Sequence, residues 1–124
     1  DNLSSKEELV EFSKNLIDRF GPLPPQVDDL LQSFELRWLA QSLGMEKLVI
    51  KSNKLIGYFI SNPQSPFYET EVFTQVLNGI QQNPARFKLS EKNEKLRVIS
   101  ENVRDLSDAF LRLNVLKASV SVEN

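Results

Sequence analysis

Residues 18–27 constrain the fold of this chain more than any other segment, because they end one helix and start another across a rigid turn. Gly21 suits the left-handed backbone at a helix C-terminus, and Pro22 cannot continue a helix. Pro25 presets φ for the first turn of the helix that follows. The segment therefore predicts two consecutive helices joined by a short, stiff connection.

The first helix is predicted over residues 5–19. Ser4 and Glu7 have the spacing of a capping box at its start. An apolar stripe recurs at helical spacing and predicts the buried face of this helix: Leu9, Phe12, Leu16 and Phe20.

The second helix is predicted over residues 25–43, with Gly44 as its stop. Apolar residues lie on more than one of its sides, in one stripe through Leu31 and a second through Leu36 and Leu43. A helix that is apolar on two sides is usually covered on both, so we expect this one at the centre of the domain.

Two β-hairpins follow, separated and closed by helices. The predicted strands are 47–51 with 55–60 and 86–90 with 95–99, and the predicted helices are 66–82 and 102–118. On the last helix, Asp108 and Arg112 are predicted to face water. The adjacent residues Tyr58 and Phe59 must point to opposite faces of their sheet, so at least one of them is predicted in the core. Short hairpins without a parallel crossover favour an α+β fold, a single layered domain in which two hairpins form an antiparallel sheet packed by about four helices.

Composition favours a protein or small-molecule partner over a nucleic acid. The 124 residues carry a net charge of −2, with a pI near 5.2, whereas phosphate binding relies on Lys and Arg. A local basic excess over residues 86–97 is interpreted first as a solvated hairpin face. No apolar run approaches the roughly 20 residues that span a bilayer, so no membrane partner is expected and the cytoplasm is the default location, with which the absence of Cys agrees.

The residue types needed for common enzyme chemistry are missing. The chain has no His and no Cys, which removes the commonest general base, thiol nucleophile and zinc ligands. Its four glycines are too dispersed for a phosphate-binding loop. We therefore predict no catalytic residues, no metal and no cofactor.

Two motifs carry a resemblance to a known family. The run Arg19-Phe20-Gly21-Pro22-Leu23-Pro24, together with Gly44-Met45-Glu46-Lys47-Leu48, resembles the C-terminal domain of bacterial transcription-repair coupling factors, from about residue 8 to residue 117. The resemblance implies a regulatory domain over residues 1–118 and a loose tail over 119–124. Because the first residue is Asp1, we expect the chain to be part of a longer polypeptide.

The resemblance also implies a role. Members of this family are ATP-dependent DNA translocases that remove stalled RNA polymerase and recruit the excision-repair protein UvrA. Their C-terminal domain is non-catalytic and autoinhibitory: it packs on the UvrB-like N-terminal module of the same polypeptide and masks the UvrA-binding surface. The implied partners are that module directly, and UvrA and RNA polymerase indirectly.

The resemblance assigns contact residues on the first helix only, where the family pattern has two acids that meet arginines of the UvrB-like module. Asp18 matches the second acid, while Asn15 departs from the first. Glu11 lies four residues before Asn15 on the same helix face and offers a replacement charge. The interdomain contact is therefore predicted at Asp18, Asn15 and Glu11.

Two other functions stay open from the sequence. One is an accessory module that contacts nucleic acid through the basic hairpin at 86–97. The other is a self-associating structural module. The acids of the first helix could also be solvated surface groups without a partner.

Overall fold

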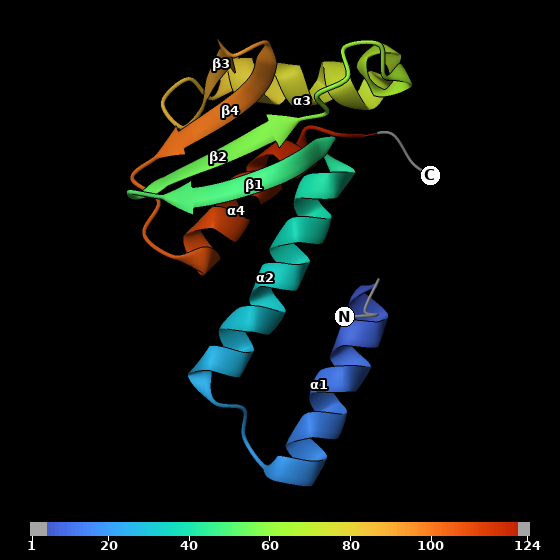
Figure 1. Ribbon diagram of the computed structural model, residues 1–124, viewed down its shortest axis with the longest axis vertical. Coiled ribbons are helices and arrows are strands. Elements are labelled where there is room, and N and C mark those ends of the chain that lie inside the picture. The colour runs from blue at the N-terminus through green and yellow to red at the C-terminus, as the bar shows by residue number, and fades with distance from the viewer. Residues whose placement is uncertain (1–4, 122–124) are drawn as a thin grey trace.

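The two hairpins form one four-stranded antiparallel sheet, as predicted. The computed structural model describes residues 5–121, and Figure 1 shows the sheet with α3 and α4 behind it and α2 running away from it. The elements are α1 (Lys6–Phe20), α2 (Pro25–Ser42), β1 (Met45–Lys51), β2 (Lys54–Phe59), the 3-10 helix η1 (Pro66–Glu69), α3 (Glu71–Gln82), β3 (Lys88–Lys92), β4 (Lys95–Glu101) and α4 (Leu106–Ala118). The strand order β1-β2-β4-β3 joins the hairpins through β2 and β4 and confirms an α+β fold.

Both glycines that were predicted to end a helix do so. Gly21 and Gly44 have φ of 86° and 87°, in the region that L side chains rarely adopt. Their backbone N–H groups donate to carbonyl oxygens of the helix before them, at 2.8 Å and 3.0 Å. Pro25 is the first residue of α2, where its missing N–H costs no hydrogen bond.

Two local predictions are corrected. The cap of α1 is Ser5, whose Oγ accepts a hydrogen bond from the Glu8 N–H at 3.1 Å; Ser4 of the predicted capping box lies outside the described residues. The helix predicted over 66–82 is divided into η1 and α3 at Thr70, whose extended backbone (φ −87°, ψ 159°) cannot continue a helix. The Thr70 Oγ1 accepts from the Phe73 N–H at 3.3 Å and so caps α3.

The hairpins close over two-residue turns in which both residues have positive φ, Ser52–Asn53 and Asn93–Glu94. This geometry matches the twist of antiparallel strands. The second turn was predicted to be four residues long, over 91–94; the shorter turn extends β3 to Lys92.

The hydrophobic core lies between the sheet and helices α2, α3 and α4. Phe59 is 1% exposed within it, so the predicted division between Tyr58 and Phe59 is confirmed. Only the second half of α2, with Leu36 and Ala40, reaches this core, and Leu43 follows directly after the helix. The central position predicted for α2 therefore holds for its C-terminal half alone, because its N-terminal half extends beyond the sheet toward α1 (Figure 1).

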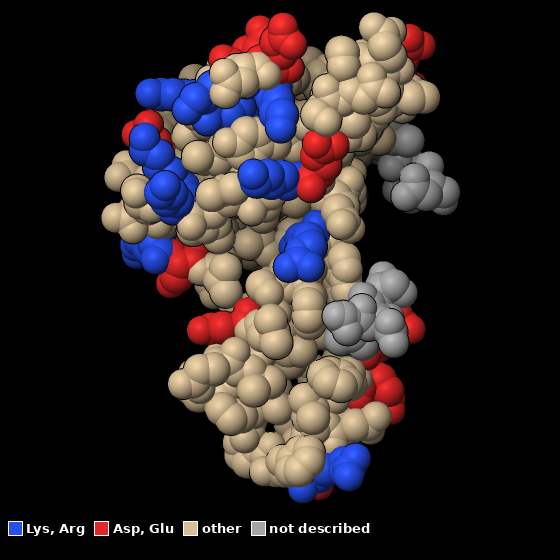
Figure 2. All heavy atoms as spheres, in the orientation of Figure 1, with Lys and Arg blue, Asp and Glu red and all other residues tan. Residues whose placement is uncertain are grey.

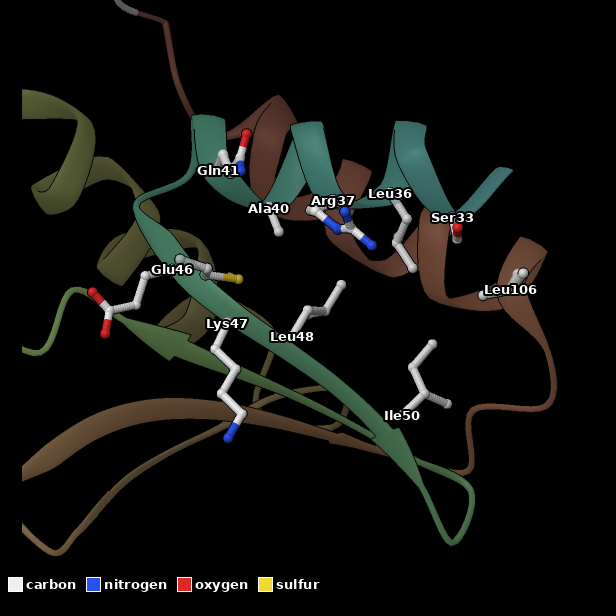
Figure 3. Close-up of a pocket in the computed structure, with 11 residues that line it drawn as sticks. Ser33, Leu36, Arg37, Ala40, Gln41, Glu46, Lys47, Leu48, Ile50 and Leu106 are labelled. Carbon is white, nitrogen blue, oxygen red and sulfur yellow. The ribbon is translucent and has the colours of Figure 1, made fainter. Parts of the chain in front are cut away.

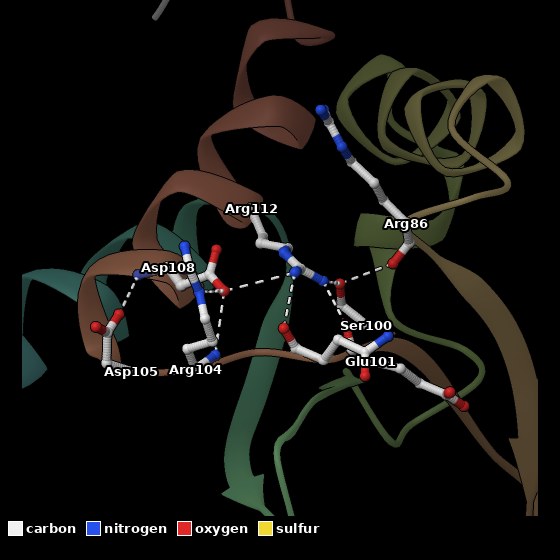
Figure 4. Close-up of polar contacts among 8 residues, drawn as sticks. Arg86, Ser100, Glu101, Arg104, Asp105, Asp108 and Arg112 are labelled. Atoms are coloured by element: carbon white, nitrogen blue, oxygen red, sulfur yellow. Dashed lines mark hydrogen bonds and ion pairs between the residues drawn. The ribbon is translucent and has the colours of Figure 1, made fainter.

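Arg112 connects α4 to the end of β4, contrary to the prediction that it faces water. Its guanidinium donates to Ser100 Oγ at 2.8 Å and to the carbonyl oxygens of Glu101 and Asn102 at 2.6 and 3.0 Å (Figure 4). It also reaches Asp108 Oδ2 at 3.5 Å. The side chains of Arg112 and Asp108 are only 19% and 12% exposed, because residues 102–105 fold back over them before α4 begins. The loop between β4 and α4 is thus a corner of the domain that hydrogen bonds and an ion pair hold in place.

This corner gives the domain a pH-dependent stability. The Arg104 backbone N–H donates to Asp108 at 3.1 Å, and this bond, with the charges of Arg112 and Arg104, lowers the pKa of the Asp108 carboxyl against the opposing effect of desolvation. A lowered folded-state pKa stabilises the fold above the unfolded value, about 3.9, and the contribution is lost as pH falls through the folded-state pKa. We expect Asp108→Asn to reduce the free energy of unfolding more at pH 7 than at pH 3, as urea titrations at both values will show. An equal reduction at the two pH values would contradict this assignment.

The end of the chain is described as far as Ser121. Val120 packs against the core, and Ser121 exchanges two hydrogen bonds with Gln75, each 2.9 Å. The rest of the predicted tail, residues 122–124, lies outside the described residues. Within residues 5–121, no helix combines the length and apolar character needed to cross a membrane.

Candidate functional site

The three residues predicted to contact a partner lie on α1. Glu11, Asn15 and Asp18 are all exposed, and their spacing of four and three residues sets them on one face of the helix. None of their side chains forms a hydrogen bond or an ion pair within residues 5–121. Their polar groups are therefore available for an external partner.

Exposed hydrophobic side chains gather around the same helix. Within residues 5–121, five of the eight large exposed hydrophobic residues lie on α1 or near the start of α2: Val10, Phe12, Ile17, Phe20 and Leu30. Clustered exposed apolar surface of this kind marks interaction sites in soluble proteins. Of the stripe predicted to be buried, Leu9 is buried, whereas Phe12 and Phe20 are 43% and 74% exposed, so the prediction is wrong for these two residues.

The exposure follows from how α1 is attached. Figure 1 shows α1 beside the N-terminal half of α2 and clear of the sheet. Leu9 and Leu31 are buried here, outside the main core. Lys6 and Glu35 form an ion pair of 3.8 Å that is largely exposed, which contributes little stability. One neighbouring helix covers one face of α1 and leaves the others open.

A groove of about 490 Å³ runs between α1 and α2 and links the polar and apolar features. Asp18 lines it with Val10 and Ile17, whereas Glu11 and Asn15 lie outside it. Its other lining residues are Leu9, Ser13, Lys14, Leu23, Asp28, Leu31, Gln32 and Glu35. We use the term "α1 surface" for Glu11, Asn15 and Asp18 together with Val10 and Ile17.

Val10 and Ile17 were not among the residues predicted for this site. They are 56% and 45% exposed and lie seven residues apart, so they form a second apolar line beside the predicted stripe. The available signal was the number of apolar residues on α1, which exceeds what a helix can bury against a single neighbour.

A second groove, of about 410 Å³, lies between α2 and β1. Figure 3 shows Leu36, Ala40 and Leu48 pointing into it, while Lys47 points to the opposite side of the strand. In the part of the chain that the structure describes, no group of three or more His, Cys, Asp or Glu is placed to hold a metal ion. The groove thus combines an apolar wall with the side chain of Arg37 from α2.

Comparison with known proteins identifies the family. The family model of the TRCF domain matches residues 1–70. The transcription-repair-coupling factor of Borreliella burgdorferi (strain ATCC 35210 / DSM 4680 / CIP 102532 / B31) is 28% identical over 109 residues, which cover 82% of this chain and 10% of that protein. The chain thus spans about a tenth of this relative.

A solved structure shows the same fold. The crystal structure of the C-terminal domain of transcription-repair coupling factor matches with a TM-score of 0.69 at 18% identity, over 95% of this chain and 74% of the other. The agreement covers the sheet and its helices together. Since the family model also matches more than half of the residues, the chain belongs to the TRCF domain family, and its fold is that of the C-terminal domain of transcription-repair coupling factor.

Proposed function

We propose that this domain is the non-catalytic, autoinhibitory module of a cytoplasmic, ATP-dependent DNA-translocating transcription-repair coupling factor. In this proposal the α1 surface packs on the UvrB-like module of the same polypeptide and masks its UvrA-binding surface. Engagement of RNA polymerase and DNA by the parent protein would then release the contact. The observation that carries the proposal is the combination of exposed acids and exposed apolar side chains on a helix attached to only one neighbour.

The apolar and the polar side chains of the α1 surface contribute to the proposed contact in different ways. Burying Val10 and Ile17 against a partner contributes about 25 cal/mol per Å² of apolar surface removed from water. A charge-assisted hydrogen bond from a partner arginine to Asp18 adds direction and selects the partner. Asn15 can offer only a neutral hydrogen bond, so the contact is weaker than one made by two acids.

A contact of modest affinity is suited to reversible masking of the UvrA-binding surface. A domain that is tethered to its partner binds at a high effective concentration, so a modest intrinsic affinity keeps the site covered. Release then requires only that another state of the parent stabilise the open arrangement by a similar amount.

We expect Asp18→Arg to weaken binding of the 124-residue chain to the isolated UvrB-like module at least tenfold, which equals about 1.4 kcal/mol. The reversal removes the attraction between Asp18 and an arginine of the partner, and it adds a repulsion between two positive charges. Calorimetric titration measures the effect. Glu69→Arg is the matched control, because Glu69 is exposed on η1 and its reversal changes the net charge equally. Asn15→Glu restores the family's first acid and is expected to tighten binding.

The masking step has its own test in the full-length parent. Deleting residues 1–124 is expected to increase UvrA binding, measured by pull-down or titration. Unchanged UvrA binding would contradict masking. A stable dimer of the isolated chain in light scattering, lost in Ile17→Ser, would instead show that the α1 surface serves self-association.

A further inference from the structure

The face of the sheet away from the helices is strongly basic. Leu55, Gly57 and Phe59 are buried, so the alternate residues of β2 point to the other face. Directly paired residues in antiparallel strands share a face, and the pairing extends this assignment to β1, β4 and β3. The charged residues on the outer face are Lys47, Lys51, Lys54, Lys88, Lys92, Lys95, Arg97 and Glu101.

The net charge of the chain does not reveal this basic face. Seven of its 15 Lys and Arg residues lie there, against one carboxylate at the paired strand positions, that of Glu101, 3.8 Å from Lys88, and a second, that of Glu46, beside Lys47 and Tyr58. Figure 2, in the orientation of Figure 1, shows Lys and Arg gathered over the sheet. The net charge of −2 therefore results from acids placed elsewhere. A local concentration of one sign attracts an oppositely charged partner whatever the net charge.

An aromatic ring lies within the basic face. Tyr58 pairs with Lys47 on β1 and with Arg97 on β4, and the Lys47 Nζ lies 5.4 Å from the centre of its ring. A hollow of about 300 Å³ connects the two hairpins at this point and is lined by Glu46, Lys47, Tyr58, Lys92, Asn93 and Lys95. The hollow thus places three lysines around one ring.

Arg97 has unused hydrogen-bonding capacity. Its Nη2 reaches Ser90 Oγ only at 3.5 Å, and its buried Nε has no hydrogen-bond partner within residues 5–121. A guanidinium has five N–H donors, and buried donors are normally satisfied. An anionic oxygen that reached this guanidinium would supply an acceptor for its unused donors.

We propose that this basic face binds a single strand of nucleic acid, with the lysines against phosphates and a base stacked on Tyr58. Six of the seven cations are Lys, which act as point charges and tolerate the variable position of a backbone phosphate. Because Lys and Arg bind carboxylates as well as phosphates, the choice of nucleic acid over an acidic protein rests on the aromatic ring among the lysines. The partly exposed ring of Tyr58 adds stacking, which sequence-tolerant single-strand binders use. This contact involves residues separate from the α1 surface, so it adds to the proposed clamp.

The test is fluorescence anisotropy of a labelled 20-residue oligothymidylate with the 124-residue chain. If four phosphates are neutralised, affinity falls about 50-fold between 50 and 200 mM salt. Tyr58→Ala is expected to weaken binding about tenfold, while Tyr58→Phe, which keeps the stacking face, leaves it unchanged. The double variant Lys47→Glu/Lys95→Glu is expected to abolish binding at 200 mM salt.

The matched control is Lys14→Glu/Lys117→Glu, which makes the same change in net charge on α1 and α4. Equal losses in the two double variants would overturn the proposal, because they would reflect net charge alone. Binding of polyglutamate without binding of the oligonucleotide would also overturn it and assign the face to an acidic protein. Circular dichroism of each variant confirms that a loss of binding is not a loss of fold.

Discussion

Replacing Gly44 with alanine is expected to lower the free energy of unfolding by about 2–5 kcal/mol. Two costs combine. The left-handed backbone at Gly44, with φ of 87°, costs an L residue about 1–2 kcal/mol, and overpacking a filled site costs about 1–3 kcal/mol. The site is filled because the Phe67 ring occupies the position that a Cβ would take.

The Phe67 ring has little freedom to move aside. It packs edge-to-face on Tyr68 and Phe73, with ring centroids 5.6 and 5.4 Å apart. Gly44 itself is held on both sides, because its N–H donates to Gln41 and its carbonyl accepts from the Ile60 N–H at 3.2 Å. The strain therefore stays at the contact.

Urea unfolding measures this effect, and thermal unfolding is expected to show a fall in Tm of roughly 10–20 °C. Gly21→Ala is the matched control. Gly21 has nearly the same φ, 86°, with ψ of −167°, and nothing lies within 4 Å of a Cβ built on it, so only a backbone cost of about 1–3 kcal/mol applies. Phe67→Ala should remove the difference between the two glycine positions. Equal losses at Gly21 and Gly44 in the presence of Phe67 would contradict the steric explanation.

Replacing Arg112 with methionine is expected to cost about 2–4 kcal/mol. Methionine keeps the length of the apolar stem but removes donors to one hydroxyl, two carbonyls and a carboxylate at the β4–α4 corner. Hydrogen bonds from a charged donor are worth about 1.5–3 kcal/mol each, and water replaces part of this for the exposed carbonyls. Ser100, which is 2% exposed, keeps only its bond to the Arg86 carbonyl at 2.7 Å.

Arg104 offers the comparison that isolates geometry from charge. It also pairs with Asp108, at 3.7 Å, but its side chain is 85% exposed, so Arg104→Met should change the free energy of unfolding by less than about 0.5 kcal/mol. The loss in the free energy of unfolding for Arg112→Lys should lie between those of Arg112→Met and Arg104→Met. Lysine keeps a charge near Asp108 but lacks the guanidinium fork that reaches two carbonyls. A loss in Arg112→Met no larger than that in Arg104→Met would show that the corner is not a stabilising unit.

Local interactions made much of the fold predictable from the sequence. Gly21, Pro25 and Gly44 act through their own backbone angles, so the helix ends they predict were found in the structure. The alternation in β2 assigned Tyr58 and Phe59 to opposite faces for the same reason. The class of fold follows from these signals, because short hairpins between helices leave few other arrangements. The family motifs lie in these same segments.

Charge and exposure depended on contacts between distant segments. The pairing of Tyr58 with Arg97 joins two hairpins that are separate in the sequence, and only this pairing collects their lysines on one face. Arg112 has the polarity of a surface residue but is largely buried where its guanidinium bonds to Ser100, Glu101 and Asn102. The position of α1 beside α2 alone left Val10 and Ile17 exposed. A residue's own backbone preference is local and was readable from the sequence, whereas its solvent exposure depends on every segment that packs near it, and only the tertiary structure decided that.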